Sequence, residues 1–124
     1  MPTITLNTPD GFSLPALHVP SATGTGQPLV LIQEIFGINA AMREAAQHWA
    51  ALGFEVLCPD LFARQRPGVD LDPAQPEQFQ AGIQLMMGMD QDLAIRDLEA
   101  ARQWFADREA GARVVALGYC LGGR

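Results

Sequence analysis

Three short apolar runs constrain the fold of this chain more than any other feature of its sequence. They occupy residues 29–34 (LVLIQE), 54–58 (FEVLC) and 113–119 (RVVALGY). Continuous apolar runs of this length are typical of strands that are buried on both faces. Helical patterns separate the runs, and strands that alternate with helices favour a parallel sheet in an α/β fold. Right-handed crossovers then place the helices on the faces of that sheet.

Two amphipathic helices are predicted between these strands. Asn39 is a favourable N-cap for a helix that ends near Leu52, where Gly53 follows as a C-terminal signal. Its expected apolar face consists of Ala41, Ala45, Trp49 and Leu52. Asp90 can cap a second helix to about Asp107, with an apolar stripe of Ala94, Leu98, Ala101 and Phe105. A shorter helix around 77–87 is less regular, since Gly82 and Gly88 interrupt it.

The N-terminal segment and the long central loop complete the organisation. Extended segments at 3–7 and 14–19 flank Asp10-Gly11, a strong turn signal, so they predict a β-hairpin. Residues 59–77 contain four prolines and have no regular periodicity. Irregular loops of that length are more often functional than not.

Length and charge exclude several classes of function. The chain has 124 residues, enough for one domain, and a formal net charge of −6 without any lysine. The negative charge disfavours nucleic acid as a partner, and the absence of lysine excludes Schiff-base and P-loop chemistry. No apolar run could span a membrane and no signal peptide is evident, so a cytoplasmic protein is expected. Two cysteines and no Cys/His cluster predict neither a disulfide framework nor a metal site.

The sequence GYCLGG at 118–123 presents a cysteine directly after the third apolar run. Gly118 and Gly122 lie two residues on either side of Cys120, as a sharp strand-to-helix turn that presents a nucleophile requires. The start of the following helix would lower the pKa of the thiol. The alternative is that Cys120 is a small buried residue; the preceding strand and the double glycine favour the nucleophile. Cys58, which ends a strand before Pro59, is expected to be structural.

Four blocks of the sequence together resemble the dienelactone hydrolase family, which has the α/β-hydrolase fold. They are QEIFGINAAMRE at 33–44, CPDLFARQ at 58–65, DLEAA at 97–101 and GYCLGG at 118–123, in the order found in the family. The resemblance covers nearly all of the chain. It implies the first five strands of that fold, in a mostly parallel sheet of order 1-2-4-3-5 with flanking helices.

The resemblance also implies roles for individual residues. Cys120 corresponds to the nucleophile, and Glu34 to a carboxylate beside it that controls its ionisation. The backbone N–H groups of Ile35 and Leu121 would form the oxyanion hole. Phe36 is expected either to line the substrate pocket or to belong to the core. Family members cleave dienelactones or related esters without a metal or organic cofactor, so a small-molecule ester or lactone is the expected partner.

Part of the family's machinery has no counterpart in this sequence. In this fold the acid and the histidine follow the nucleophile, whereas His18 and His48 both precede Cys120. Both histidines are expected to be packing or surface residues. Residues 1–124 are therefore expected to form a partial domain, truncated just after the nucleophile turn and inactive alone.

Substrate binding is expected to differ from the family as well. Extending the match without gaps places Phe79 near the position of an arginine that grips the substrate carboxylate in the family. Arg64 and Arg66 lie earlier in the loop and are not that residue. This departure favours a less anionic ester.

Two other functions stay open. In the implied strand order, the 113–119 strand is an uncovered apolar edge, which suits a non-catalytic module that associates with itself or with a complementing fragment. The second is thiol redox sensing at Cys120, which would require a depressed thiol pKa. No resolving cysteine is evident near it.

Overall fold

The computed structural model of the chain describes residues 3–24 and 26–118, which form five strands and three helices. In chain order these are β1 (Thr3–Asn7), β2 (Ser13–Val19), β3 (Gln27–Ile32), α1 (Ala40–Ala51), β4 (Phe54–Pro59), α2 (Pro76–Met87), α3 (Gln91–Arg108) and β5 (Val115–Gly118). All the predicted elements are present, including the hairpin of β1 and β2. The predicted caps form as well, since Asn39 accepts from the Met42 N–H and Asp90 from the Leu93 N–H.

The five strands form one mixed sheet of order β1-β2-β4-β3-β5. β1 pairs with β2 and β2 with β4 in antiparallel fashion, while β3 lies between β4 and β5 with both neighbours parallel to it. This is the order that the sequence resemblance implied, and it confirms the predicted fold class. Parallel neighbours need long crossover connections between them. α1 lies in the connection from β3 to β4, and α2 and α3 lie in the connection from β4 to β5.

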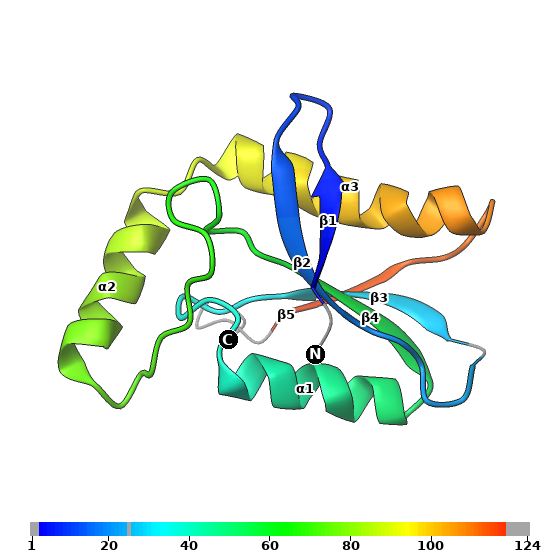
Figure 1. The fold of residues 1–124 in the computed structure, drawn as a ribbon, viewed down its shortest axis with the longest axis horizontal. Helices are drawn as coiled ribbons and strands as arrows, with labels where there is room; N and C mark the ends of the chain where they lie inside the picture. Colours follow the sequence, from blue (N-terminus) through cyan, green and yellow to red (C-terminus); the bar gives the residue numbers. More distant parts are fainter. Residues whose placement is uncertain (1–2, 25, 119–124) are drawn as a thin grey trace.

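α1 covers one face of the sheet and α3 covers the other, while α2 lies beyond the end of the sheet (Figure 1). Successive side chains of a strand point to opposite faces of the sheet, so the same strands contribute to a hydrophobic core on each face. Leu29, Leu31, Val56 and Cys58 pack with the α1 side chains. Val30 and Leu57 face the other way and pack with Ala101 and Phe105 of α3. A third cluster joins α2 to the loops at the end of the sheet.

Two sequence predictions, the buried face of the first helix and the bounds of the strand at 29–34, differ in detail from the structure. The buried residues of α1 are Met42, Ala46 and Ala50; of the predicted face, Ala45 and Trp49 are partly buried against the same core. Met42 occupies the core, while Leu52, at the end of the helix, is 60% exposed. β3 is also shifted relative to the predicted strand at 29–34, because Gln27 and Pro28 already pair with β4 and the strand ends at Ile32.

Two further corrections concern glycine and the last strand. Gly82 does not interrupt α2, which continues to Met87 and is capped by Gly88. β5 was predicted as a buried strand, yet its described residues are exposed or only partly buried because the strand lies at an edge of the sheet. That edge position is the one the resemblance implied.

None of the helices within residues 3–24 and 26–118 is both long and apolar enough to cross a membrane.

Candidate active site at the end of β3

A tight turn of residues 34–37 follows β3 and carries three of the predicted site residues. The Gly37 N–H donates to the Glu34 carbonyl oxygen at 3.2 Å. Gly37 has a φ of +75°, and a Cβ there would lie 2.2 Å from the Val69 carbonyl oxygen. Only glycine fits both conditions. The turn therefore depends on the glycine of the QEIFG block, and it fixes where Glu34 and Ile35 lie relative to the strand.

The central loop holds this turn from the other side. Leu71 donates its N–H to the Phe36 carbonyl oxygen at 2.9 Å, and Ile38 donates to Val69 at 3.2 Å. The Asn39 side chain adds a bond to the Leu71 carbonyl oxygen at 3.0 Å. Residues 69–71 of the irregular 59–77 segment therefore support the QEIFG turn.

Gln33 is a positioning residue that the sequence reasoning missed. Its side chain is buried, and its Oε1 accepts from the Leu61 N–H at 2.8 Å while its Nε2 donates to the Glu34 carbonyl oxygen at 3.2 Å. One amide therefore ties the end of β3 to the start of the central loop. A polar glutamine at the end of an apolar run is the signal that could have indicated this role, since such a group requires partners when it is buried.

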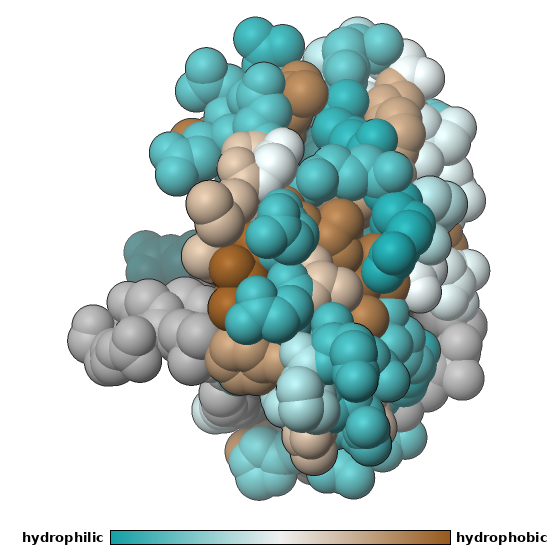
Figure 2. All heavy atoms as spheres, turned by 90° about the vertical axis from the view of Figure 1, so that its left-hand side faces the viewer, coloured by the Kyte–Doolittle hydropathy of each residue, from teal (hydrophilic) through white to brown (hydrophobic). Residues whose placement is uncertain are grey.

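The two predicted pocket aromatics, Phe36 and Phe79, contact each other. Their ring centroids lie 5.5 Å apart with the planes tilted by 53°. Phe36 is buried in the third core cluster, and Phe79 is half-buried against it. Seen from the α2 end, apolar side chains show between mainly hydrophilic ones (Figure 2). The assignment of Phe36 and Phe79 to a substrate pocket remains a prediction.

Gly82 brings α2 against the same turn. A Cβ at this position would lie 2.5 Å from the Ile35 carbonyl oxygen, closer than real side chains come. The absence of a side chain therefore allows the helix to approach the backbone that carries the predicted oxyanion donor. The glycine that seemed to weaken α2 instead positions it.

Glu34 borders an open depression on the surface next to α1. Ala41, Met42, Glu44, Ala45 and His48 line it as well. His48 is therefore nearer to a predicted site residue than its place on the first crossover helix indicated. Cys120 and Leu121, the predicted nucleophile and second oxyanion donor, lie outside the described residues.

Arg64 is fully engaged within the fold. Its guanidinium donates to both carboxylate oxygens of Asp97, with the shortest bond at 2.9 Å, and to both oxygens of Asp10, with the shortest also at 2.9 Å. It also lies 4.5 Å from the centre of the Phe12 ring. These contacts raise its pKa, with the Asp97 hydrogen bonds as the largest cause. Arg64 therefore joins the hairpin, the central loop and α3.

Cys58 and His18 have structural surroundings, as predicted. Cys58 is completely buried under α1, and burial raises the pKa of its thiol to about 12, with a smaller contribution from the charge of Asp60. His18 forms a 2.8 Å contact with Glu55 and packs edge-on against Trp104. Across residues 3–24 and 26–118, no group of three or more histidine, cysteine or acidic side chains is placed to hold a metal ion.

The strand order, the helices on both faces and the turn after β3 are those of the N-terminal part of the α/β-hydrolase fold. Comparison with known proteins agrees. Residues 14–124 match the model of the dienelactone hydrolase family. A carboxymethylenebutenolidase from Pseudomonas putida is 37% identical over 121 residues, covering 97% of this chain and 51% of that protein. One from Rhodococcus opacus is 35% identical over 116 residues, covering 94% of this chain and 43% of that protein.

Solved structures give the same result. A crystal structure assigned to the dienelactone hydrolases, from Klebsiella pneumoniae subsp. pneumoniae, superposes with a TM-score of 0.73 at 26% identity. The match covers 99% of this chain and 51% of that structure. The chain therefore belongs to the dienelactone hydrolase family. It spans about half the length of the curated relatives it matches.

Proposed function

We propose that this chain supplies the nucleophile and the oxyanion donors of an ester or lactone hydrolase, with Cys120 as the nucleophile. The observation that carries the proposal is the register of β3 against β5, in which Ile32 lies opposite Gly118. Glu34 follows Ile32 by two residues in the sequence, and Cys120 follows Gly118 by two. The carboxyl ends of neighbouring parallel strands are where open α/β sheets bind ligands.

The proposed reaction proceeds through a thioester. The Cys120 thiolate attacks the carbonyl carbon, and the backbone N–H groups of Ile35 and Leu121 stabilise the resulting oxyanion. The carbon–oxygen bond of the ester breaks, and the alcohol leaves with a proton from a general acid. Water then hydrolyses the thioester, yielding the carboxylate and the free thiol. Glu34 is proposed to control how readily the thiol ionises.

The general base is proposed to come from outside these 124 residues. His18 is held by Glu55 and Trp104. His48 lines the surface depression that Glu34 also borders. We propose that neither histidine of this chain is the base, and we therefore expect the 124-residue chain to acylate once and then stop.

Mass spectrometry after incubation with 4-nitrophenyl acetate tests this proposal. We expect one acetyl group on Cys120, absent in Cys120→Ala and retained in the matched Cys58→Ala control. Glu34→Gln should shift the pH dependence of Cys120 alkylation by iodoacetamide. Steady release of nitrophenolate by the chain alone, or acetylation that persists in Cys120→Ala, would contradict the proposal.

Substrate preference belongs to the same proposal. Phe79 is half-buried against Phe36, so the position that the resemblance assigns to a carboxylate-binding arginine carries an apolar ring instead. We propose that the preferred ester carries less negative charge there than a dienelactone does. Competition between a neutral and an anionic ester for Cys120 acylation measures this preference directly.

The position of β5 supports a second candidate function, self-association through the sheet. Within the described sheet β5 has a strand on one side only, and Val115 is 45% exposed. Edges of this kind pair readily with other chains. Light scattering that gives a stable monomer without binding of a hydrophobic dye would rule it out.

A further inference from the structure

A groove of about 610 Å³ runs between the β1 edge of the sheet and α3, on a surface separate from the candidate active site. Its apolar lining includes Ile95, Ala100 and Trp104 of α3. Ile95 is 64% exposed, so the groove offers an accessible apolar surface to a ligand. The proposed hydrolase chemistry uses none of these residues.

The β1 edge presents free backbone groups to this groove. Thr5 lies opposite Pro15 in the β1–β2 pairing, and the Pro15 carbonyl oxygen accepts from the Asp60 N–H, on the side of β2 away from β1. Thr5 and Pro15 are therefore a non-hydrogen-bonded pair. The N–H and carbonyl of Thr5 point outward, and by the two-residue period so do those of Thr3 and Asn7.

The acidic side chains that line the groove have polar partners, whereas its arginines lack acidic ones within the described residues. Glu99 is paired with Arg102, and Asp107 accepts from the Gln103 side chain at 2.7 Å. In the described part of the chain, Arg96 has neither an ion pair nor a hydrogen bond.

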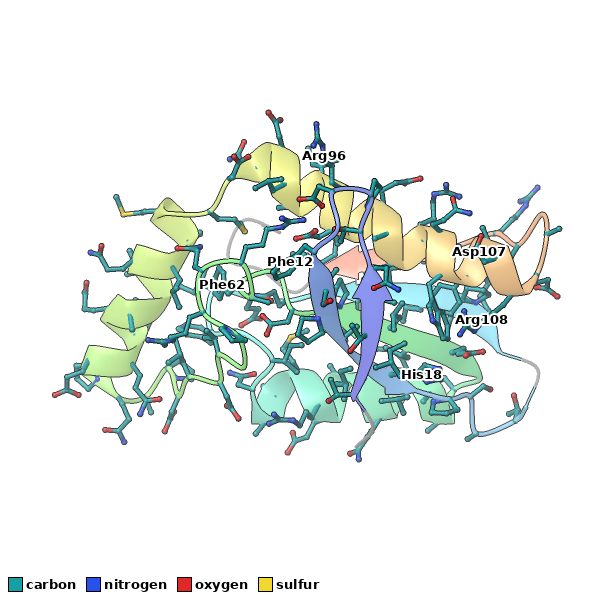
Figure 3. The ribbon with its side chains drawn as sticks, turned by 45° about the horizontal axis from the view of Figure 1, so that its top comes forward. Phe12, His18, Phe62, Arg96, Asp107 and Arg108 are labelled. Atoms are coloured by element: carbon teal, nitrogen blue, oxygen red, sulfur yellow. The ribbon has the colours of Figure 1, made fainter. Side chains whose placement is uncertain are left out.

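Arg108 is the second available cation. It stacks 3.4 Å from the centre of the Trp104 ring and donates to the Trp104 carbonyl oxygen, with no carboxylate partner among the residues described. Figure 3 shows Arg96 near one end of α3 and Arg108 near the other, with β1 in front of the helix. The groove therefore offers two guanidinium groups that lack acidic partners.

We propose that this groove binds an extended peptide segment that adds a strand to β1 and carries acidic side chains for Arg96 and Arg108. The backbone of the segment bonds to Thr3, Thr5 and Asn7, and its apolar side chains cover Ile95 and Trp104. Strand addition to an open edge is an established way of binding peptides. Arginine suits the acidic side chains because its fork matches a carboxylate.

A second copy of this chain fits the groove less well. Its own β1 has the sequence TITLN, which would bring no carboxylate to either arginine. The net charge of −6 does not prevent an acidic segment from binding. Charges further away than about 8 Å are largely screened at physiological ionic strength, so the two local guanidinium groups dominate.

Fluorescence anisotropy with the labelled peptide Glu-Thr-Val-Thr-Val-Thr-Glu tests the proposal on the purified chain. We expect saturable binding that weakens with added salt, and none for the peptide with lysine in place of glutamate. Arg96→Glu should weaken binding about tenfold or more, the scale of one lost charge-assisted hydrogen bond. Arg66→Glu, the same charge change at an exposed site outside the groove, should leave it unchanged.

Thr5→Pro separates strand addition from simple charge attraction. It removes an outward N–H without removing a β1–β2 hydrogen bond, and proline is tolerated on edge strands. We expect it to abolish peptide binding while the circular dichroism of the chain stays the same. Equal binding by Thr5→Pro, or equal loss in Arg96→Glu and Arg66→Glu, overturns the proposal. A dimer in sedimentation equilibrium that Thr5→Pro dissociates also overturns it, because a second copy would then be the occupant.

Discussion

Replacing Arg64 with alanine should destabilise this protein strongly, because the substitution leaves the Asp97 carboxylate buried without a cation. Asp97 is completely buried on α3, and among the described residues its charge partner is the Arg64 guanidinium, at 2.9 Å. The same guanidinium holds Asp10 of the hairpin turn at 2.9 Å. One side chain therefore joins three segments that are distant in the sequence.

The expected loss is large relative to the total stability. Removing one partner of a buried ion pair costs about 3–5 kcal/mol, since the remaining charge stays desolvated. Domains of this size are stable by only about 5–15 kcal/mol. At about 4 °C per kcal/mol for a chain of this length, the melting temperature should fall by roughly 12–20 °C.

Urea unfolding followed by far-UV circular dichroism measures this loss. Arg102→Ala is the matched control, because Arg102 pairs with Glu99 on the exposed side of the same helix and should barely change the midpoint. The double variant Arg64→Met with Asp97→Leu removes both charges and should recover much of the stability. Equal midpoints for Arg64→Ala and Arg102→Ala would refute the reasoning. If Arg64→Ala fails to fold, refolding in the double variant still separates an unpaired charge from lost packing.

Three further predictions test other parts of the fold. Gly82→Ala should destabilise α2 by about 1–3 kcal/mol despite alanine's higher helix propensity, because its Cβ would meet the neighbouring turn; an increase in the urea midpoint would contradict this. In a Cys120→Ala background, Cys58 should resist iodoacetamide at mildly alkaline pH until urea unfolds the chain, since burial raises its pKa to about 12; labelling of the native protein would show that the site opens. The Arg64 hydrogen bonds lower the pKa of Asp10 below its ordinary 3.8, so its stabilisation is present above that pH and is lost as the pH falls below it. The stability difference between the wild type and Asp10→Asn should therefore be present at neutral pH and shrink in acid; a constant difference would contradict the assignment.

The elements of this fold follow from local features of the sequence. Apolar runs of strand length, Asn39 and Asp90 as caps and the Asp10-Gly11 turn all act within a few residues of where they stand. Such signals depend on neighbours along the chain, so one sequence is enough to interpret them. The strand order required more, because hydrophobic patterning does not specify which strands are adjacent. The resemblance carried in the QEIFG and GYCLGG blocks supplied it.

The features that sequence reasoning missed depend on partners distant in the sequence. The buried face of α1 is centred on Met42 because the sheet accepts that side chain, whereas helical periodicity alone allows the neighbouring face equally well. Asp97 interrupts the apolar stripe of α3, and an aspartate is ordinarily expected to face solvent. It is buried here because Arg64 of the central loop pairs with it. Gln33 likewise becomes a positioning residue only once the Leu61 backbone is beside it. A buried polar side chain is costly without a partner. A polar residue within a pattern that otherwise predicts burial therefore indicates that a partner exists, while only the structure identifies which residue it is.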